Sequence, residues 1–220
     1  MVKIYLDSGS LEDIRRYGSK VEGFTTNPSL MKAAGITNYL SFAEKALYAA
    51  ADKPISMEVI SDDFHAMEKQ ARALASLGNS VIVKIPVTNT KGESCIPLIK
   101  DLRDVRLNIT AVMTREQIDA LGEVDSQLNI VSIFAGRIAD TGRDPEWTML
   151  HAKGVIKKSL RLWASAREIL NVSQAEECGC DIITLGPSLI NKLDLHGKPL
   201  AEYSLETVRQ FHEDGKGIQW

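Results

Sequence analysis

The sequence predicts a single (β/α)8-barrel domain with an extra C-terminal helix, and three observations support this. Eight short apolar runs recur along the chain, and a helix-like stretch follows each one, as expected of βα units around a parallel sheet. The length of 220 residues suits such a barrel and gives no reason to divide the chain. No glycine fingerprint for a dinucleotide follows the first run, which favours a closed barrel over an open doubly wound sheet.

The predicted strands are the apolar runs themselves. They cover residues 4–7, 23–26, 55–60, 81–85, 107–112, 130–134, 160–165 and 181–185. Because the strands of a parallel barrel are buried on both faces, near-continuous apolar runs are what such strands require.

Capping residues in the sequence predict where several helices begin. Ser10 is a plausible N-cap with Asp13 three residues later, and Thr114 with Gln117 forms a capping box. In residues 62–77 the apolar positions step by three or four, which predicts a helix with one face on the barrel.

The last segment, residues 205–220, follows the eighth unit and carries apolar side chains that a free tail would leave in water. These are Val208, Phe211, Ile218 and Trp220. We expect this segment to pack on a neighbouring subunit.

Composition excludes several classes of protein. The hydrophobic share of 44% with 25% charged residues is that of a globular protein, and no apolar stretch reaches the roughly 20 residues of a membrane span. The net charge of −3 gives no general attraction to nucleic acid. The N-terminus lacks the pattern of a signal peptide, so we expect a cytoplasmic protein.

The cysteines and histidines give no metal signature. Cys95, Cys178 and Cys180 are an odd number, and one residue separates the last two where zinc sites usually have two or more, so we interpret them as plain thiols. The four histidines fall in predicted helices or loops rather than at strand ends, which argues against a metal-dependent barrel enzyme. We expect neither metal nor other cofactor.

Polar and charged residues interrupt nearly every predicted strand. Buried parallel strands should lack them, and most of them lie near the strand ends, where barrel enzymes assemble their sites. They are Asp7, Thr25, Thr26, Asn27, Glu58, Lys84, Asn108, Thr110, Ser132 and Ser165. Their convergence predicts one polar site at the mouth of the barrel.

Lys84 is the most informative residue of this set, because its charged side chain lies between the apolar Val83 and Ile85. Loss of hydration there favours the neutral amine, which is a nucleophile toward carbonyls. With the carboxylates of Glu58 and Asp7 and the nearby hydroxyl and amide groups, the set provides what imine chemistry needs. The alternative is a structural lysine paired with one of these carboxylates.

A cationic group lies late in the chain, where barrels often hold phosphate. Arg137 follows the sixth run, and Ser165 and Arg167 close the seventh. A guanidinium fork matches phosphate oxygens, and a serine hydroxyl adds a donor. The alternative is that these arginines pair with surface carboxylates such as Asp140 or Glu168.

Six segments carry motifs of a known family. They cover residues 23–30, 56–59, 83–88, 107–110, 132–138 and 164–167, and they include Thr-Thr-Asn-Pro-Ser-Leu and Lys-Ile-Pro-Val-Thr. In this order the segments resemble the transaldolase family, in particular its short-chain branch, which includes fructose-6-phosphate aldolase. The likeness extends from Asp7 to the strand that contains Thr184.

This resemblance implies a class I mechanism without metal, in which Lys84 forms an imine with the ketone of a donor sugar phosphate. Asp7 would take the proton of the C4 hydroxyl, and Glu58 with Thr110 would hold the catalytic water. The implied substrate-binding residues are Thr26, Asn27, Asn108, Ser132 and Phe134. The implied phosphate-binding residues are Arg137, Ser165 and Arg167.

Cleavage of the donor would leave a dihydroxyacetone unit on Lys84 as an enamine, and two positions bear on what happens to it. Here the sequence resembles transaldolases, which have glutamate at the Glu58 position and phenylalanine at the Phe134 position, whereas the free-ketone aldolases carry glutamine and tyrosine there. The resemblance therefore implies transfer of a dihydroxyacetone unit from fructose 6-phosphate or sedoheptulose 7-phosphate to an aldose phosphate. The alternative is an aldolase that releases free dihydroxyacetone.

A further alternative is a phosphosugar-binding barrel without activity. Burying Lys84, Asp7 and Glu58 costs several kcal/mol for each unpaired ion, which a silent protein has no chemical reason to bear. The resemblance also implies a homo-oligomer, a pentamer or decamer. The stretch between Asp140 and Ser159, with Arg143 and Trp147, resembles nothing specific to the family, and the acceptor aldehyde stays open.

Overall fold

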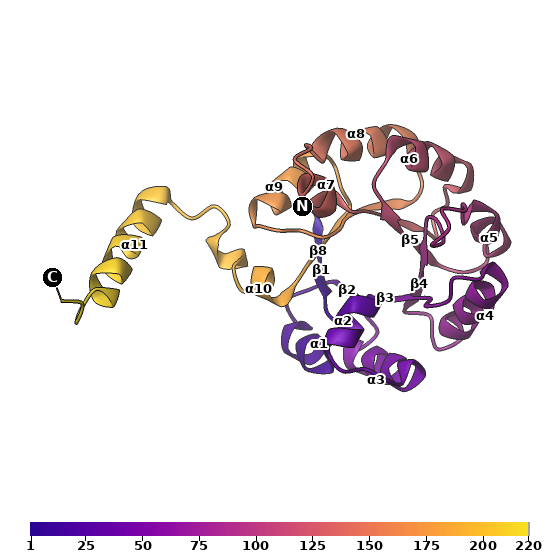
Figure 1. The fold of residues 1–220 in the computed structure, drawn as a ribbon, viewed down its shortest axis with the longest axis horizontal. Coiled ribbons are helices and arrows are strands. Elements are labelled where there is room, and N and C mark those ends of the chain that lie inside the picture. The colour runs from indigo at the N-terminus through magenta and orange to yellow at the C-terminus, as the bar shows by residue number, and fades with distance from the viewer. Residues whose placement is uncertain (220) are drawn as a thin grey trace.

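The computed structural model describes residues 1–219, which form a closed barrel of eight parallel strands with an extra helix at the C-terminus (Figure 1). The strands run in sequence order around the barrel, and β8 closes it against β1. They are β1 (Lys3–Asp7), β2 (Gly23–Thr25), β3 (Ile55–Glu58), β4 (Val81–Pro86), β5 (Leu107–Val112), β6 (Ile130–Ile133), β7 (Leu160–Trp163) and β8 (Ile182–Leu185). The predicted fold class is confirmed.

All helices but the last surround this barrel (Figure 1). The α-helices are α1 (Leu11–Tyr17), α2 (Pro28–Ala33), α3 (Tyr39–Ala50), α4 (Phe64–Ala75), α5 (Ile96–Asp101), α6 (Arg115–Leu121), α7 (Ala135–Ala139), α8 (Glu146–Val155), α9 (Leu170–Glu177), α10 (Pro187–Ile190) and α11 (Leu200–Asp214). The short 3-10 helices are η1 (Gly122–Val124) and η2 (Leu193–Leu195). Both predicted caps are present, since Ser10 accepts from the Asp13 N–H and Thr114 forms the full capping box with Gln117.

The core has two parts, because successive side chains of a strand point to opposite faces. A large cluster lies between the strands and the helices, and a smaller one takes the alternate strand positions that face the barrel interior. The smaller cluster is Tyr5, Ile82, Ile130, Leu162, Ala164 and Ile182.

This interior cluster positions the polar residues of the strands. Lys84 lies two residues after Ile82 on β4, and Ser132 lies two residues after Ile130 on β6. Side chains two apart share a face, so these polar groups also point into the barrel, one layer nearer the carboxyl ends of the strands. Asp7 and Thr184 follow Tyr5 and Ile182 in the same way.

Some boundaries differ from the predictions. Strand β3 ends at Glu58 rather than at residue 60, and β7 ends at Trp163 rather than at residue 165. Ser165 has a φ of 62°, a left-handed conformation that cannot continue a strand. Helix α4 covers less than the predicted residues 62–77, because the Asp63 side chain caps its first turn.

The C-terminal segment departs most from a regular barrel. Helix α10 has only four residues, and α11 begins at Leu200, earlier than the predicted 205. Figure 1 shows α11 standing away from the barrel, and none of its residues, all described by the structure, is buried. Trp220 lies outside the described residues.

Cys95, Cys178 and Cys180 are free and buried. Burial raises the pKa of Cys95 and Cys178 to about 11 and that of Cys180 to about 12. Within residues 1–219 no helix has the length and apolar character needed to cross a membrane. Nor do these residues bring three or more His, Cys, Asp or Glu side chains together as a metal ion would require.

Candidate active site at the mouth of the barrel

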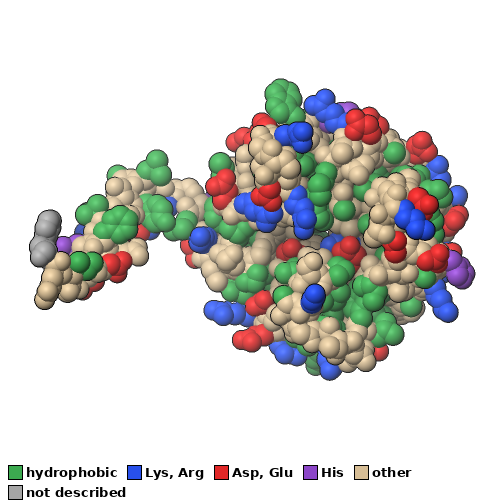
Figure 2. Space-filling model, in the orientation of Figure 1, with side chains coloured by type: hydrophobic (Ala, Val, Ile, Leu, Met, Phe, Trp, Pro, Cys, Tyr) green, Lys and Arg blue, Asp and Glu red, His purple; other side chains and the backbone are tan. Residues whose placement is uncertain are grey.

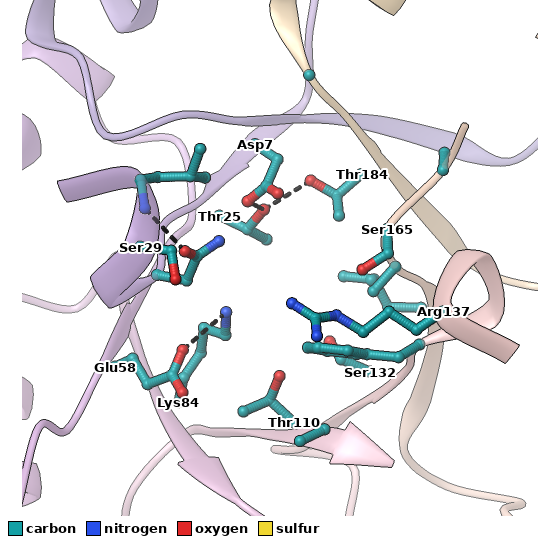
Figure 3. A pocket seen from close by; sticks show the side chains of 18 of the residues that line it. Asp7, Thr25, Ser29, Glu58, Lys84, Thr110, Ser132, Arg137, Ser165 and Thr184 are labelled. Carbon is teal, nitrogen blue, oxygen red and sulfur yellow. Dashed lines mark hydrogen bonds and ion pairs between the residues drawn. The ribbon is translucent and has the colours of Figure 1, made fainter. Parts of the chain in front are cut away.

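A cavity of about 580 Å³ opens at the carboxyl ends of the strands (Figure 3). Ten of the twelve residues predicted for the site line it. They are Asp7, Asn27, Glu58, Lys84, Thr110, Ser132, Phe134, Arg137, Ser165 and Arg167, which leaves only Thr26 and Asn108 outside. Figure 2 shows charged side chains of both signs around the central hollow.

 

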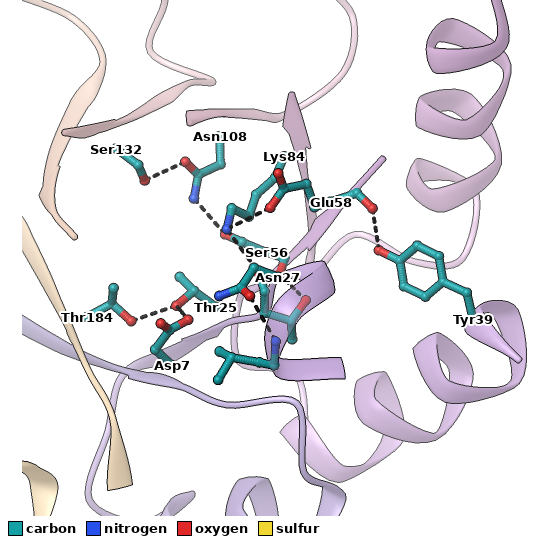
Figure 4. Close-up of polar contacts among 12 residues, drawn as sticks. Asp7, Thr25, Asn27, Tyr39, Ser56, Glu58, Lys84, Asn108, Ser132 and Thr184 are labelled. Carbon is teal, nitrogen blue, oxygen red and sulfur yellow. Dashed lines mark hydrogen bonds and ion pairs between the residues drawn. The ribbon is translucent and has the colours of Figure 1, made fainter. Parts of the chain in front are cut away.

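Lys84 lies at the bottom of this cavity with its amine held by two acceptors. Its side chain is buried, and Nζ lies 3.1 Å from Glu58 Oε2 and donates to the Thr26 carbonyl over 2.8 Å (Figure 4). The pairing of β3 with β4 sets Glu58 directly beside Lys84, so the strand register makes this ion pair. Burying an ion pair costs desolvation energy, so the pair contributes little to stability. A role in function explains its presence better than a role in stability does.

Asp7 ends β1 and points into the same cavity as Lys84 (Figure 3). Burial raises the pKa of the Asp7 carboxyl, and the Lys84 charge and a hydrogen bond from Thr25 oppose this rise. Thr25 Oγ1 donates to Asp7 Oδ1 over 2.8 Å and lies 2.6 Å from Thr184 Oγ1. A carboxyl with a raised pKa accepts a proton more readily than an ordinary aspartate does.

Thr110 has a buried hydroxyl with no hydrogen-bond partner among the described residues. It lines the cavity from β5, where the ladder with β6 is irregular between Ile109 and Val112. The next residue, Ala111, has a φ of 62°, a strained conformation for a residue with a side chain. An unpaired buried hydroxyl facing a cavity is suited to binding water or substrate.

Ser132 is the cavity-facing end of a buried hydrogen-bond chain. Its hydroxyl donates to Asn108 Oδ1 over 2.6 Å, and Asn108 Nδ2 donates to Ser56 Oγ over 3.0 Å. Asn108 is fully buried and does not line the cavity, so its amide orients Ser132 from behind.

The segment after β2 supplies Thr26 and Asn27. Thr26 is also fully buried, its hydroxyl donates to the Ser56 carbonyl over 3.0 Å, and only its own carbonyl reaches Lys84. Asn27 lines the cavity and caps α2, accepting from the Leu30 N–H over 3.0 Å. Its amide nitrogen has no such role in the cap and is available to a ligand.

Arg137 and Ser165 form the cationic side of the cavity. The Arg137 guanidinium lies over the Phe134 ring, 5.7 Å from its centroid, and Figure 3 shows it extending across the cavity toward Lys84. Gly136 lets α7 approach the segment that follows β7: a Cβ at this position would lie 1.6 Å from the Ser165 carbonyl oxygen. The glycine therefore permits the contact that holds the left-handed Ser165 in place.

Arg167 lines the cavity but is engaged elsewhere. Its guanidinium donates to both oxygens of Asp140, over 3.1 and 2.5 Å, and about half of each side chain is exposed. The sequence left open whether the two arginines pair with surface carboxylates, and Arg167 does so whereas Arg137 does not.

Three functional neighbours were missed in the sequence. Thr184 of β8 reaches Asp7 through Thr25, and the Tyr39 hydroxyl donates to the Glu58 carbonyl over 2.7 Å. Burial, and next the charge of Glu58, raise the pKa of Tyr39, so it stays a donor. Ser56 supports Asn108 from β3. Alternation on β8 could have indicated Thr184, but nothing in the sequence signals Tyr39.

Comparison with known proteins gives one consistent family. A model of the family described as Transaldolase/Fructose-6-phosphate aldolase matches residues 4–219. A protein of Nitrosopumilus maritimus named "Probable transaldolase" is 32% identical over 212 residues, which is 93% of this chain and 92% of that protein. One of the same name from Thermoplasma acidophilum is 30% identical over 229 residues, covering 99% of this chain and all (100%) of that protein.

Among solved structures, the chain resembles dihydrodipicolinate synthase from Rhodopseudomonas palustris. The TM-score is 0.60 at 14% identity, and the match covers 89% of this chain and 74% of that one. At this identity the likeness concerns the fold alone, and it agrees with the barrel described above.

Proposed function

This chain belongs to the transaldolase/fructose-6-phosphate aldolase family, and from that premise we propose that it is a class I transaldolase acting without a metal. The proposed reaction moves a dihydroxyacetone unit from fructose 6-phosphate or sedoheptulose 7-phosphate to an aldose phosphate. The observation that carries the proposal is the buried Lys84 amine, which lies 3.1 Å from Glu58 and faces a cavity that it shares with Asp7.

The first step is imine formation. Glu58 is close enough to take a proton from the Lys84 ammonium, which leaves the amine free to add to the C2 ketone of the donor. Loss of one water molecule then gives the imine. We assign Glu58 and Thr110 to the water that carries these protons, because the Thr110 hydroxyl faces the cavity unpaired.

The second step breaks the bond between C3 and C4. The proton of the C4 hydroxyl passes to Asp7, the bonding electron pair moves toward the imine, and the aldehyde leaves. An enamine of dihydroxyacetone stays on Lys84. The same steps in reverse join it to the acceptor aldehyde, and Asp7 returns the proton to the new hydroxyl.

The remaining residues position the substrate in this proposal. Ser132 and the Asn27 amide donate to substrate hydroxyls, while Asn108 and Thr26 act from behind the cavity wall. Arg137 and Ser165 hold the donor phosphate, and Arg167 joins them by exchanging Asp140 for a phosphate oxygen.

An assay of group transfer tests this function. Wild-type protein with fructose 6-phosphate and erythrose 4-phosphate should form sedoheptulose 7-phosphate, and without an acceptor it should release little free dihydroxyacetone. Lys84→Met should abolish transfer, and Lys69→Met, on the exposed face of α4, should retain it. Transfer that survives in Lys84→Met would contradict the proposed nucleophile.

We also propose that the protein is a cytoplasmic homo-oligomer assembled through α11. An apolar stripe at helical spacing supports this: Leu200, Tyr203, Val208 and Phe211 are exposed by 83%, 46%, 59% and 69%. Light scattering should give a multiple of the chain mass, and deletion of residues 199–220 should lower it. An unchanged mass after deletion would contradict assembly through α11.

A further inference from the structure

A second cavity of about 580 Å³ lies beside the active site, and the proposed transfer reaction does not use it. Its walls come from the start of α6, from α7 and from the start of α8. Arg137 lines both cavities, so the two cavities adjoin at this residue.

The charge of the second cavity is strongly positive. Arg115, Arg137 and Arg143 line it, and none of these guanidinium groups makes a hydrogen bond or ion pair within residues 1–219. Arg72, Arg161 and Arg167, in contrast, each bond a carboxylate. Three unpaired guanidinium groups around one cavity repel one another unless an anion lies between them.

The single carboxylate in the wall does not cancel this charge. Asp144 accepts the backbone N–H of Glu146 over 2.9 Å, which ties it to the start of α8. The nearby Asp140 is already bonded to Arg167 through both oxygens. The cavity therefore keeps an excess of positive charge and has donors for a phosphate dianion.

Trp147 adds an apolar surface to this cationic cavity. Its side chain is 65% exposed although it is large and apolar, and it stands on the first turn of α8 in the cavity wall. An indole ring offers a flat face to the C–H groups of a sugar, and the arginines offer donors to a phosphate. The combination fits a phosphorylated carbohydrate better than a free anion.

We propose that this second cavity binds the phosphate end of a long acceptor, an aldose phosphate of five carbons or more. The inference rests on the proposed transaldolase function. A triose phosphate whose aldehyde carbon meets the enamine on Lys84 would place its phosphate near Arg137 and Ser165. A longer chain extends beyond Arg137, packs against Trp147 and places its phosphate between Arg115 and Arg143.

The test compares acceptors of different length with fructose 6-phosphate as the fixed donor. Wild-type protein and the variants Arg115→Met, Arg143→Met and Trp147→Ala are assayed with glyceraldehyde 3-phosphate, with ribose 5-phosphate and with unphosphorylated ribose. Arg15→Met, on an exposed arginine of α1 that lines neither cavity, is the matched control.

Each arginine variant should lose about tenfold or more in kcat/KM for ribose 5-phosphate, as expected when a charged hydrogen bond is removed. The same variants should change less than about twofold with glyceraldehyde 3-phosphate and with ribose, and Arg15→Met should match the wild type throughout. Trp147→Ala should weaken both five-carbon acceptors, because it removes contact with the sugar rather than with the phosphate.

Three results would overturn the inference: equal losses for all phosphorylated acceptors, no loss in either arginine variant, or a wild type that does not use ribose 5-phosphate. Inorganic phosphate should compete with ribose 5-phosphate in the wild type and less so in Arg115→Met. If phosphate competes equally in both, Arg115 does not hold the phosphate of the acceptor, and the inference also fails. Borohydride trapping of the donor on Lys84 separates these results from a failure of the proposed function, because it needs no acceptor.

Discussion

A methyl group added at Gly136 would strike the backbone of Ser165, and this substitution tests how the phosphate side of the site is built. The new Cβ would lie 1.6 Å from the Ser165 carbonyl oxygen and 2.6 Å from its carbonyl carbon. Ordinary contact needs at least 3.4 Å, so the backbone around Ser165 or α7 must move by about 2 Å. Both Ser165 and Arg137 are placed by this contact.

The expected cost follows from this displacement. Overpacking of this kind costs about 1–3 kcal/mol, which lowers the unfolding midpoint of a domain of this size by about 2–12 °C. A displacement of about 1 Å can cost about a hundredfold in rate. Gly136→Ala should therefore lower kcat/KM for fructose 6-phosphate by about that factor, with a much smaller effect on unphosphorylated fructose.

Gly154→Ala is the matched control, because Gly154 lies in α8 and an added Cβ there meets nothing within 4 Å. The alanine should stabilise that helix by about 0.5–1 kcal/mol. Gly136 is also helical, so helix propensity alone would predict stabilisation there too. A Gly136→Ala protein as stable and as active as Gly154→Ala would refute the steric reasoning.

Three other substitutions have defined outcomes. Asp7→Asn should abolish transfer and raise the unfolding midpoint at pH 7. Burial raises the Asp7 pKa, so ionisation of this carboxyl costs stability above that pKa. In thermal melts, the difference in midpoint between Asp7→Asn and the wild type should therefore shrink as the pH falls toward 4. A midpoint difference that does not change with pH would contradict this. Phe134→Tyr should increase the release of free dihydroxyacetone from fructose 6-phosphate without acceptor, because a phenol can supply a proton that a phenyl ring lacks. An unchanged rate of dihydroxyacetone release in an enzymatic assay would count against this role of the side chain at position 134. Asp140→Asn should free Arg167 and lower KM for fructose 6-phosphate. The decrease should be up to about fivefold, because the exposed ion pair that is lost is worth about 0.2–1 kcal/mol. A higher KM would mean that Asp140 orients the arginine.

The sequence was informative where local pattern decides the structure. Apolar runs of the right length predicted all eight strands, and the fixed order of a barrel then places Glu58 beside Lys84. Alternation along β4 and β6 aims Lys84 and Ser132 inward. These features depend on neighbours along the chain or on adjacent strands, and both can be read from residue order.

The sequence could not predict features that depend on exact register or on side-chain partners. Whether Arg167 turns toward a ligand or toward Asp140 depends on distances between loops, which the residue types leave open. Asn108 has the same polarity as Ser132, yet it lies one layer behind it. Tyr39 belongs to α3, and its hydroxyl bonds a backbone carbonyl of β3, a partner that has no signature in the side chains.

The extent of the C-terminal helix also escaped the sequence. Its apolar positions were recognised at Val208 and Phe211, but the helix already starts at Leu200. Pro199 precedes it, and the four-residue α10 is all the helix that follows β8 directly. The apolar stripe is visible in the sequence, whereas its separation from the barrel is a property of the three-dimensional fold (Figure 1).

Borohydride reduction of the protein with fructose 6-phosphate, followed by mass analysis of its peptides, tests directly whether Lys84 is the nucleophile. We expect one added dihydroxyacetone-derived or hexose-derived group, located on the peptide that contains Lys84 and absent from Lys84→Met. A stable adduct on another lysine, or full activity without any adduct, would contradict this role of Lys84.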